Sequence, residues 1–221
     1  MLPSALPTWS KMPPVANMPH GFAWGLFDDK PDGPKDELGT LNLLTPEVVL
    51  EAAKTEIRTG KSVSLNWGME KQHQPGFDRT GLRHRFIDWR EKARETGGPD
   101  FFSYDDEITV NTQVGSQWDG LRHWAHQPTG LYYNGLHHDD VLKSDHLGIN
   151  HWNDRGGIVG RGILFDYVAH AARNRISFNP MSRHPITVSD LKAIANDCNI
   201  VPRPGDILLV QQSSPYVRFL K

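Results

Sequence analysis

The sequence predicts an α/β protein with a single domain, because helix and strand patterns alternate along a chain of about the right length. The chain has 221 residues, close to the usual size of one domain. A helix signal at Thr45 and short apolar runs within 160–172 and 202–210 support this prediction. The helices and strands interleave without a strict βαβ repeat, and the sequence contains no internal repeat.

Each element is predicted from a local signal. Residues 1–20 contain five prolines and are expected to form an extended arm. A helix is expected to follow Thr45, which suits the N-cap position before Pro46, and to stop at Gly60. The other elements are expected, in chain order, as a strand at 61–69, a helix within 86–98, a strand with a following turn at 107–120, a loop at 131–160, a buried strand within 160–172, a helix after Thr187 and a buried strand within 202–210.

Composition and charge exclude several classes of function. Lys plus Arg is 24 and Asp plus Glu is 26, a net charge of −2, so no strong positive field favours nucleic-acid binding. Cys198 is the single cysteine, so no internal disulfide can form. No apolar run reaches the roughly 18 residues that span a bilayer, and the first residues lack the apolar core of a signal peptide. We therefore expect a soluble cytoplasmic protein with a small-molecule substrate and with neither a membrane nor a nucleic acid as partner.

The segment from Gln113 to His123 carries the candidate chemistry. In a strand, alternate side chains share a face, which places Gln113, Gln117 and Asp119 together, with His123 after a turn. Two amide oxygens, a carboxylate and an imidazole could hold a divalent ion. Neutral amides are poor metal ligands, so the residues alone favour the other interpretation, an edge strand with a solvated polar face.

This segment resembles the signature of the cyclase family of metal-dependent hydrolases, which includes bacterial kynurenine formamidase and isatin hydrolase. That signature reads His-x-Gly-Thr-His-x-Asp-x-x-x-His. Asp119 and His123 match it, as does Gly115, while Gln113 and Gln117 occupy the places of its first two histidines. The same order of similar segments continues through 36–66, 160–169 and 188–210, so the resemblance covers about residues 21–210. The Ser-Gln-Trp-Asp-Gly form at 116–120 resembles fungal-type members.

The resemblance implies a fold, a cofactor and a set of roles. The fold would be a mixed β-sheet flanked by helices, of the swivelling β/β/α type. Asp119 would be a metal ligand, with Gln113 and Gln117 as weaker ligands of Mn or Zn, and His123 would be the acid/base. Trp118 and Trp124, which neighbour these residues, are candidates for substrate binding, although large aromatics are more often part of a core.

The implied function is hydrolysis of an amide or cyclic amide in a small metabolite, as in an arylformamidase, in a secondary-metabolic setting. Two alternatives stay open. One is a cyclase or dehydratase (lyase) step at the same site, and the other is an inactive relative that binds a metabolite or a partner subunit.

The end of the chain departs from the family pattern. Family members continue beyond the strand at 202–210, and a later His and Glu complete their metal site. Here the chain runs from Gln211 to Lys221 without a matching segment. We therefore expect a cyclase-like domain at 21–221 that is truncated at its C-terminus. An exposed edge or apolar face would then favour a homo-oligomer such as a dimer.

Overall fold

The computed structural model describes residues 6–73 and 75–213 and contains two compact units. One unit comprises Met1–Gly60 and Gly120–Lys221, and the other comprises Lys61–Asp119. Strands pair in parallel in the first unit and antiparallel in the second. The predicted α/β class is therefore confirmed, and each kind of pairing forms its own two-stranded sheet. Part of the expected arm at 1–20, and the chain end after Ser213, lie outside the described residues.

The N-terminal part of the first unit follows its local signals. Apart from a 3-10 turn at Trp9–Lys11, the described part of the proline-rich arm has no helix or strand. A second 3-10 helix, Gly39–Leu43, precedes α1 (Pro46–Glu56). The Thr45 side chain accepts a hydrogen bond from the Val48 backbone N–H at 3.4 Å, which confirms the predicted N-cap. The helix ends before Gly60 is reached.

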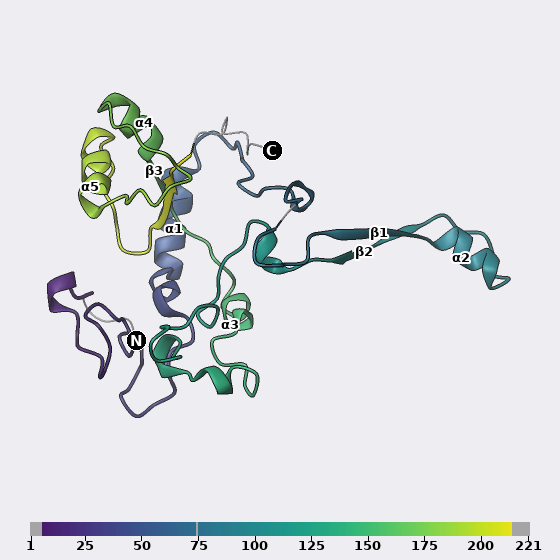
Figure 1. Cartoon of the computed structure of the whole chain (residues 1–221), viewed down its shortest axis with the longest axis horizontal. Helices are drawn as coiled ribbons and strands as arrows, with labels where there is room; N and C mark the ends of the chain where they lie inside the picture. Colours follow the sequence, from purple (N-terminus) through teal and green to yellow (C-terminus); the bar gives the residue numbers. More distant parts are fainter. Residues whose placement is uncertain (1–5, 74, 214–221) are drawn as a thin grey trace. The chain divides into compact units, whose positions relative to one another are not determined.

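The second unit is built around an antiparallel ribbon (Figure 1). Strand β1 (Arg83–Asp88) leads directly into α2 (Trp89–Glu95), and β2 (Tyr104–Thr109) returns beside β1. Asp88 ends the strand and caps the helix, because its carboxylate accepts hydrogen bonds from the Arg90 and Glu91 backbone N–H groups. The predicted helix within 86–98 is confirmed.

Two strand predictions in this unit are wrong. Residues 61–69 contain no strand, although Val63 and Leu65 alternate with polar residues, and both side chains are more than 70% exposed. An alternating pattern becomes a strand only where another strand supplies hydrogen-bond partners, and none does so here among the described residues. The strand predicted at 107–120 ends at Thr109, and a 3-10 helix, Thr112–Val114, follows.

The core lies in the C-terminal part of the first unit. Strands β3 (Gly162–Asp166) and β4 (Ile207–Gln211) pair in parallel, and α4 (Tyr167–Arg173) and α5 (Val188–Asp197) follow β3 in the chain. The buried cluster consists of Ile163, Phe165, Tyr167, Ala171 and Ile194. Both apolar runs of the sequence are thus confirmed as strands. The predicted burial holds for Ile163 and Phe165 of β3 but is wrong for β4, where Leu208 and Val210 are 52% and 39% exposed, because a two-stranded sheet does not have both faces covered. The predicted loop at 131–160 also contains two 3-10 turns, Tyr133–Gly135 and His138–Asp140, and the short helix α3 (Ile149–Asp154).

Helix α5 begins at a reciprocal capping box, which gives a testable stability contribution. The Thr187 hydroxyl accepts from the Asp190 backbone N–H at 3.2 Å, and the Asp190 carboxylate accepts from the Thr187 backbone N–H at 2.7 Å. Thr187→Ala is expected to lower the free energy of unfolding by about 1 kcal/mol. Urea unfolding would measure the loss, and Thr187→Ser, which keeps the hydroxyl, should retain most of the stability. Equal losses in both variants would contradict the role of the cap.

Among the described residues, no helix is both long enough and apolar enough to cross a bilayer.

Candidate functional site

The candidate signature segment is anchored by its backbone and by one apolar side chain. Asn111 caps the 3-10 helix by accepting a hydrogen bond from the Gln113 backbone N–H at 2.9 Å. Val114 is buried, and the Ser116 hydroxyl accepts from the Trp67 backbone N–H at 2.9 Å. These contacts fix the segment against residues 61–69 of the same unit, so the positions of its polar side chains do not depend on a β-ladder.

Gln113, Gln117 and Asp119 come together, although the reason differs from the predicted one. The Gln113 amide Nε2 donates to Asp119 Oδ1 at 2.9 Å, and the Gln117 Nε2 donates to Gln113 Oε1 at 3.4 Å. Strand alternation cannot explain this grouping, because the strand ends at Thr109. The 3-10 helix Thr112–Val114 changes the direction of the chain. The Gln113 side chain can therefore contact Gln117 and Asp119, four and six positions later.

The chemistry of these side chains decides which ion they suit. Gln113 is half-buried, and Gln117 and Asp119 are exposed. Their oxygen donors are one carboxylate and two neutral amides, a set that suits a hard ion such as Mn²⁺ and does not suit Zn²⁺, which prefers nitrogen and sulfur. The described part of the chain contains no group of three or more His, Cys, Asp or Glu residues placed to hold a metal ion.

His123 and Trp124 belong to the other unit, whose second segment starts at Gly120. A turn closes with the His123 backbone N–H donating to the Gly120 carbonyl at 2.9 Å. The His123 and Trp124 rings lie 6.5 Å apart, centre to centre, and both side chains are exposed. Trp118 is 58% and Trp124 74% exposed, so neither indole is part of a core and both can contact a ligand.

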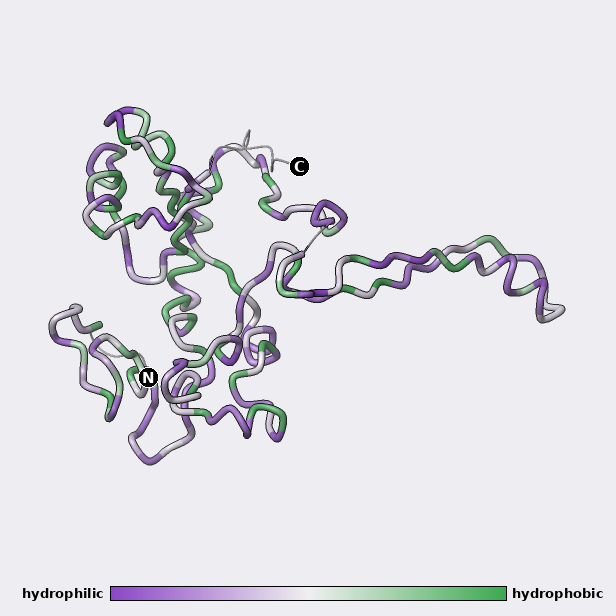
Figure 2. The backbone as a smooth tube through the Cα atoms, viewed as in Figure 1, coloured by the Kyte–Doolittle hydropathy of each residue, from purple (hydrophilic) through white to green (hydrophobic). Residues whose placement is uncertain are grey.

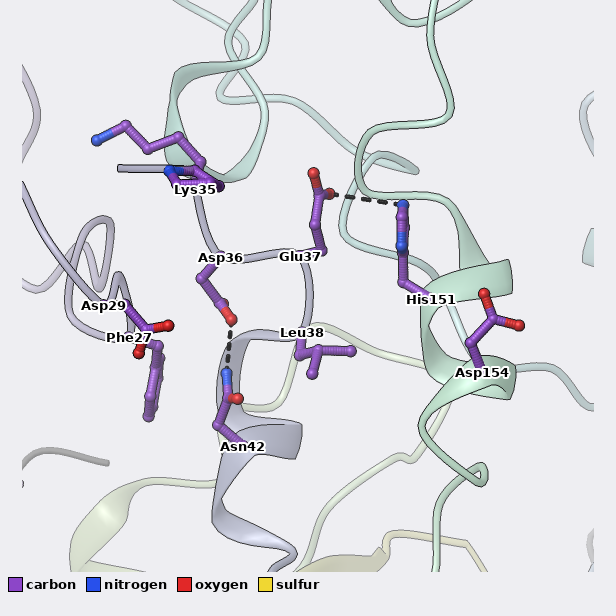
Figure 3. Close-up of a pocket in the computed structure, with 10 residues that line it drawn as sticks. Phe27, Asp29, Lys35, Asp36, Glu37, Leu38, Asn42, His151 and Asp154 are labelled. Atoms are coloured by element: carbon purple, nitrogen blue, oxygen red, sulfur yellow. Dashed lines mark hydrogen bonds and ion pairs between the residues drawn. The ribbon is translucent and has the colours of Figure 1, made fainter. Parts of the chain in front are cut away.

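A cavity of about 380 Å³ in the first unit was not predicted from the sequence (Figure 3). Glu37 lies on its wall, directed toward the His151 ring, with Glu37 Oε2 3.9 Å from His151 Nε2. The other oxygen, Oε1, lies 2.6 Å from His146 Nδ1, and Oε2 also accepts a hydrogen bond from the Leu147 backbone N–H. One carboxylate therefore links the 36–42 segment to two histidines more than 100 residues away.

Asp36, on the same wall, has a structural role. Its carboxylate accepts hydrogen bonds from the Gly39 backbone N–H and the Asn42 amide, both at 2.6 Å, and from the Tyr133 hydroxyl at 3.0 Å. Burial, together with the Asp36 charge, raises the pKa of Tyr133 far above its usual value, so the hydroxyl stays protonated and donates. With three donors on its two oxygens, Asp36 fixes the loop rather than acting as a base.

The sequence did contain a signal for this cavity. Asp36, Glu37, Gly39 and Asn42 all lie in the Asp-Glu-Leu-Gly-Thr-Leu-Asn segment that resembles the cyclase family. Gly39 has a positive φ of 59°, a conformation that favours glycine. This turn uses the glycine together with the flanking Asp36 and Asn42 side chains, whereas the histidine partners of Glu37 lie more than 100 residues away and could not be identified from the local sequence.

Comparison with known proteins finds similarity to solved structures. No family model matches the sequence, and no curated protein sequence matches it. The crystal structure of a protein described as a novel cyclase superposes with a TM-score of 0.64 and 28% sequence identity, over 79% of this chain and 58% of the solved chain. This chain therefore spans 58% of the length of the cyclase that it matches. Its α/β fold is that of a solved cyclase, and the similarity supports its place in the cyclase family.

Proposed function

We propose that this chain is a cyclase-family hydrolase that cleaves an amide or cyclic amide bond in a small, aromatic metabolite with the help of Mn²⁺. The contact between Gln113 and Asp119, at the positions of two metal ligands in the family signature, is the observation that carries the proposal. The similarity to a solved cyclase supports the enzyme class. The implied setting is secondary metabolism.

Gln113, Gln117 and Asp119 would hold the ion, which when bound would lower the pKa of a water molecule. Rotation of the Gln113 amide about its last bond exchanges Nε2 for Oε1 and presents an oxygen beside Asp119. In the observed orientation Gln117 Nε2 donates to Gln113 Oε1 at 3.4 Å, so the Gln117 amide would rotate together with that of Gln113 and present its own oxygen. Asp119 supplies the negative charge of the set.

His123 is proposed as the acid/base, because an imidazole exchanges protons near neutral pH. It would take a proton in the attack step and return it to the leaving nitrogen. Trp118 and Trp124 are proposed to contact the substrate, since exposed indoles offer large flat apolar surfaces to an aromatic ring.

Hydrolysis of N-formylaniline by the purified chain with added Mn²⁺ tests this function. His123→Ala is expected to lower the rate about 100-fold or more, as for loss of a general acid/base. His137→Ala removes another exposed histidine and should leave the rate unchanged. Absence both of formate release from N-formylaniline and of ring opening of a cyclic amide such as isatin would reject the hydrolase. Mn²⁺-dependent loss of water from a hydroxylated substrate would instead identify a lyase.

A further inference from the structure

A groove of about 330 Å³ lies between α5 and the parallel sheet of the first unit, and we call it the α5 groove. Its sheet side consists of Ile163 and Phe165 of β3 and Leu208 of β4. Ile163 pairs with Leu208 in the parallel register, so the three side chains share one face of the sheet. Helix α5 packs against β3, and Ile163 and Phe165 are buried, whereas Leu208 is 52% exposed. The helix therefore covers the β3 part of this face and leaves the β4 part open.

The helix side of the α5 groove is a single stripe of α5. It consists of Val188, Leu191, Lys192 and Ala195, which are three and four residues apart and so lie on one face of the helix. Three of them are apolar, and Val188 is 68% exposed. Figure 2 shows β3 and β4 as hydrophobic stretches and α5 as a helix with both hydrophobic and hydrophilic residues. The groove thus offers an open apolar surface of a size that suits a small molecule.

Two cations border this apolar surface. Lys192 and Arg203 both line the groove and are exposed, and neither side chain makes an ion pair or a hydrogen bond with the part of the chain that the structure describes. A lysine on an apolar stripe can simply cover it with its methylene stem. Here, however, a second cation reaches the same groove from the separate segment that leads into β4.

The acidic residue of the groove, Asp206, is already neutralised. Its two carboxylate oxygens accept hydrogen bonds from the Arg161 guanidinium at 2.7 and 2.6 Å and from the Arg203 backbone N–H at 2.6 Å. The Arg203 side chain acts on Asp206 only as a more distant charge, which helps to lower the pKa of that carboxyl group. The groove therefore carries excess positive charge beside an apolar wall.

We propose that the α5 groove binds a short fatty acid or a similar amphipathic carboxylate. The alkyl chain would lie against Val188, Leu191 and Leu208, and the carboxylate would be held by Lys192 and Arg203. A guanidinium offers two parallel N–H groups that match the two oxygens of a carboxylate. The positive charge disfavours an amine or a metal ion as the ligand. The apolar wall, which has no polar partner to offer, disfavours an inorganic anion.

A second copy of the chain fits this groove less well. In a two-fold contact the same patch of both copies meets, so Lys192 and Arg203 would face the same two cations of the partner. The proposal also goes beyond the hydrolase and does not depend on it, because Gln113, Gln117 and Asp119 belong to the other unit.

Octanoate, titrated into the purified chain, tests the proposal. Isothermal titration calorimetry should show saturable binding, and the methyl NMR signals of Ile163, Leu191 and Leu208 should shift with it. Hexanoate, which has two fewer methylene groups to bury, should bind about tenfold more weakly. Octan-1-ol should bind more weakly than octanoate, and octylamine should bind more weakly still. Absence of saturable octanoate binding, or shifts confined to other methyl groups, would overturn the proposal.

A pair of glutamate variants tests the location. Val188 is the first residue of α5 and is exposed, and a glutamate at the N-terminal end of a helix is favourable, so Val188→Glu should fold. It places a negative charge in the groove and should raise the octanoate dissociation constant tenfold or more. Ser189→Glu adds the same charge one residue further along, at an exposed position outside the groove lining, and should have little effect. Equal effects of the two variants would contradict the site.

Removing the cations tests the recognition of the carboxylate. The double variant Lys192→Met, Arg203→Met keeps much of both apolar stems and should weaken octanoate binding about fivefold or more. Binding of octan-1-ol should stay unchanged, and an equal loss for both ligands would exclude charge recognition. Sedimentation equilibrium covers the other occupant. A dimer that Val188→Glu dissociates and Ser189→Glu does not, in a chain that fails to bind octanoate, would assign the groove to a second copy and overturn the proposal.

Discussion

Asp119→Ala is expected to remove Mn²⁺ binding and to lower the hydrolysis rate by about 100-fold to 1000-fold, the effect of losing several kcal/mol of ion-supplied stabilisation. Asp119 is the one carboxylate of the proposed donor set, and the amides of Gln113 and Gln117 are neutral. Without it, no negative charge remains in the set to hold a dication. The disappearance of the free Mn²⁺ signal in electron paramagnetic resonance, titrated against protein, measures binding directly.

Asp105→Ala provides the matched control, since it removes another exposed aspartate from the same unit. It should bind Mn²⁺ as the unmodified chain does. For the unmodified chain, Mn²⁺ at 100 times its dissociation constant should also stabilise the bound fold by about 2.7 kcal/mol. Equal Mn²⁺ binding by the Asp119 and Asp105 variants would exclude the proposed ligand set, and an unmodified chain that binds no Mn²⁺ would favour an inactive relative.

Asp206→Ala is expected to lower the free energy of unfolding by about 3 kcal/mol, because it removes the closest partner of the largely buried Arg161 guanidinium and leaves only the more distant Glu56, at 3.8 Å. Arg161 Nε lies 2.7 Å from Asp206 Oδ1 and its Nη2 lies 2.6 Å from Oδ2. The two side chains are only 15% and 8% exposed. This pair joins the residue before β3 to the residue before β4 and so holds the parallel sheet in register. Denaturant unfolding at neutral pH measures the loss.

Asp140→Ala is the control for this prediction, because the Asp140–Lys143 pair is equally close, at 2.9 Å, but has side chains 50% and 68% exposed. An exposed ion pair contributes about 1 kcal/mol or less. Comparable losses in both variants would show that the Arg161–Asp206 pair does not hold the sheet.

The same pair predicts how stability depends on pH. Burial raises the pKa of Asp206, but hydrogen bonds from Arg161 and the Arg203 backbone outweigh it, so the pKa lies below its usual value. Asp206 therefore binds its proton more tightly in the unfolded chain than in the folded one. The contribution of the pair to the free energy of unfolding is present above a pH of about 4, and it is lost as the pH falls through the lower pKa that Asp206 has in the folded chain. Asp206→Ala should therefore show a weaker loss of stability on acidification than the unmodified chain.

Local signals in the sequence were sufficient for helices α1, α2 and α5 and for strands β3 and β4. Thr45 with Val48, and Thr187 with Asp190, act through contacts three residues apart, so a short stretch of sequence contains every group involved. The short apolar runs of β3 and β4 were sufficient to predict strands, although only β3 contains buried residues. The alternation at 61–69 failed for the opposite reason, because a strand requires a partner that no local pattern supplies.

The amino-acid sequence by itself determined where α1 and α5 begin, which apolar runs become strands, and that Gln113, Gln117 and Asp119 are candidates for one polar group. Only the tertiary structure decided how that group assembles, through a 3-10 turn instead of a strand. It also decided that Glu37 meets His146 and that Arg161 meets Asp206. A helix cap involves residues that are close to one another along the chain. The Arg161–Asp206 and Glu37–His146 contacts instead join residues 45 and 109 positions apart. Which residues come together over such separations is set by the packing of the whole unit.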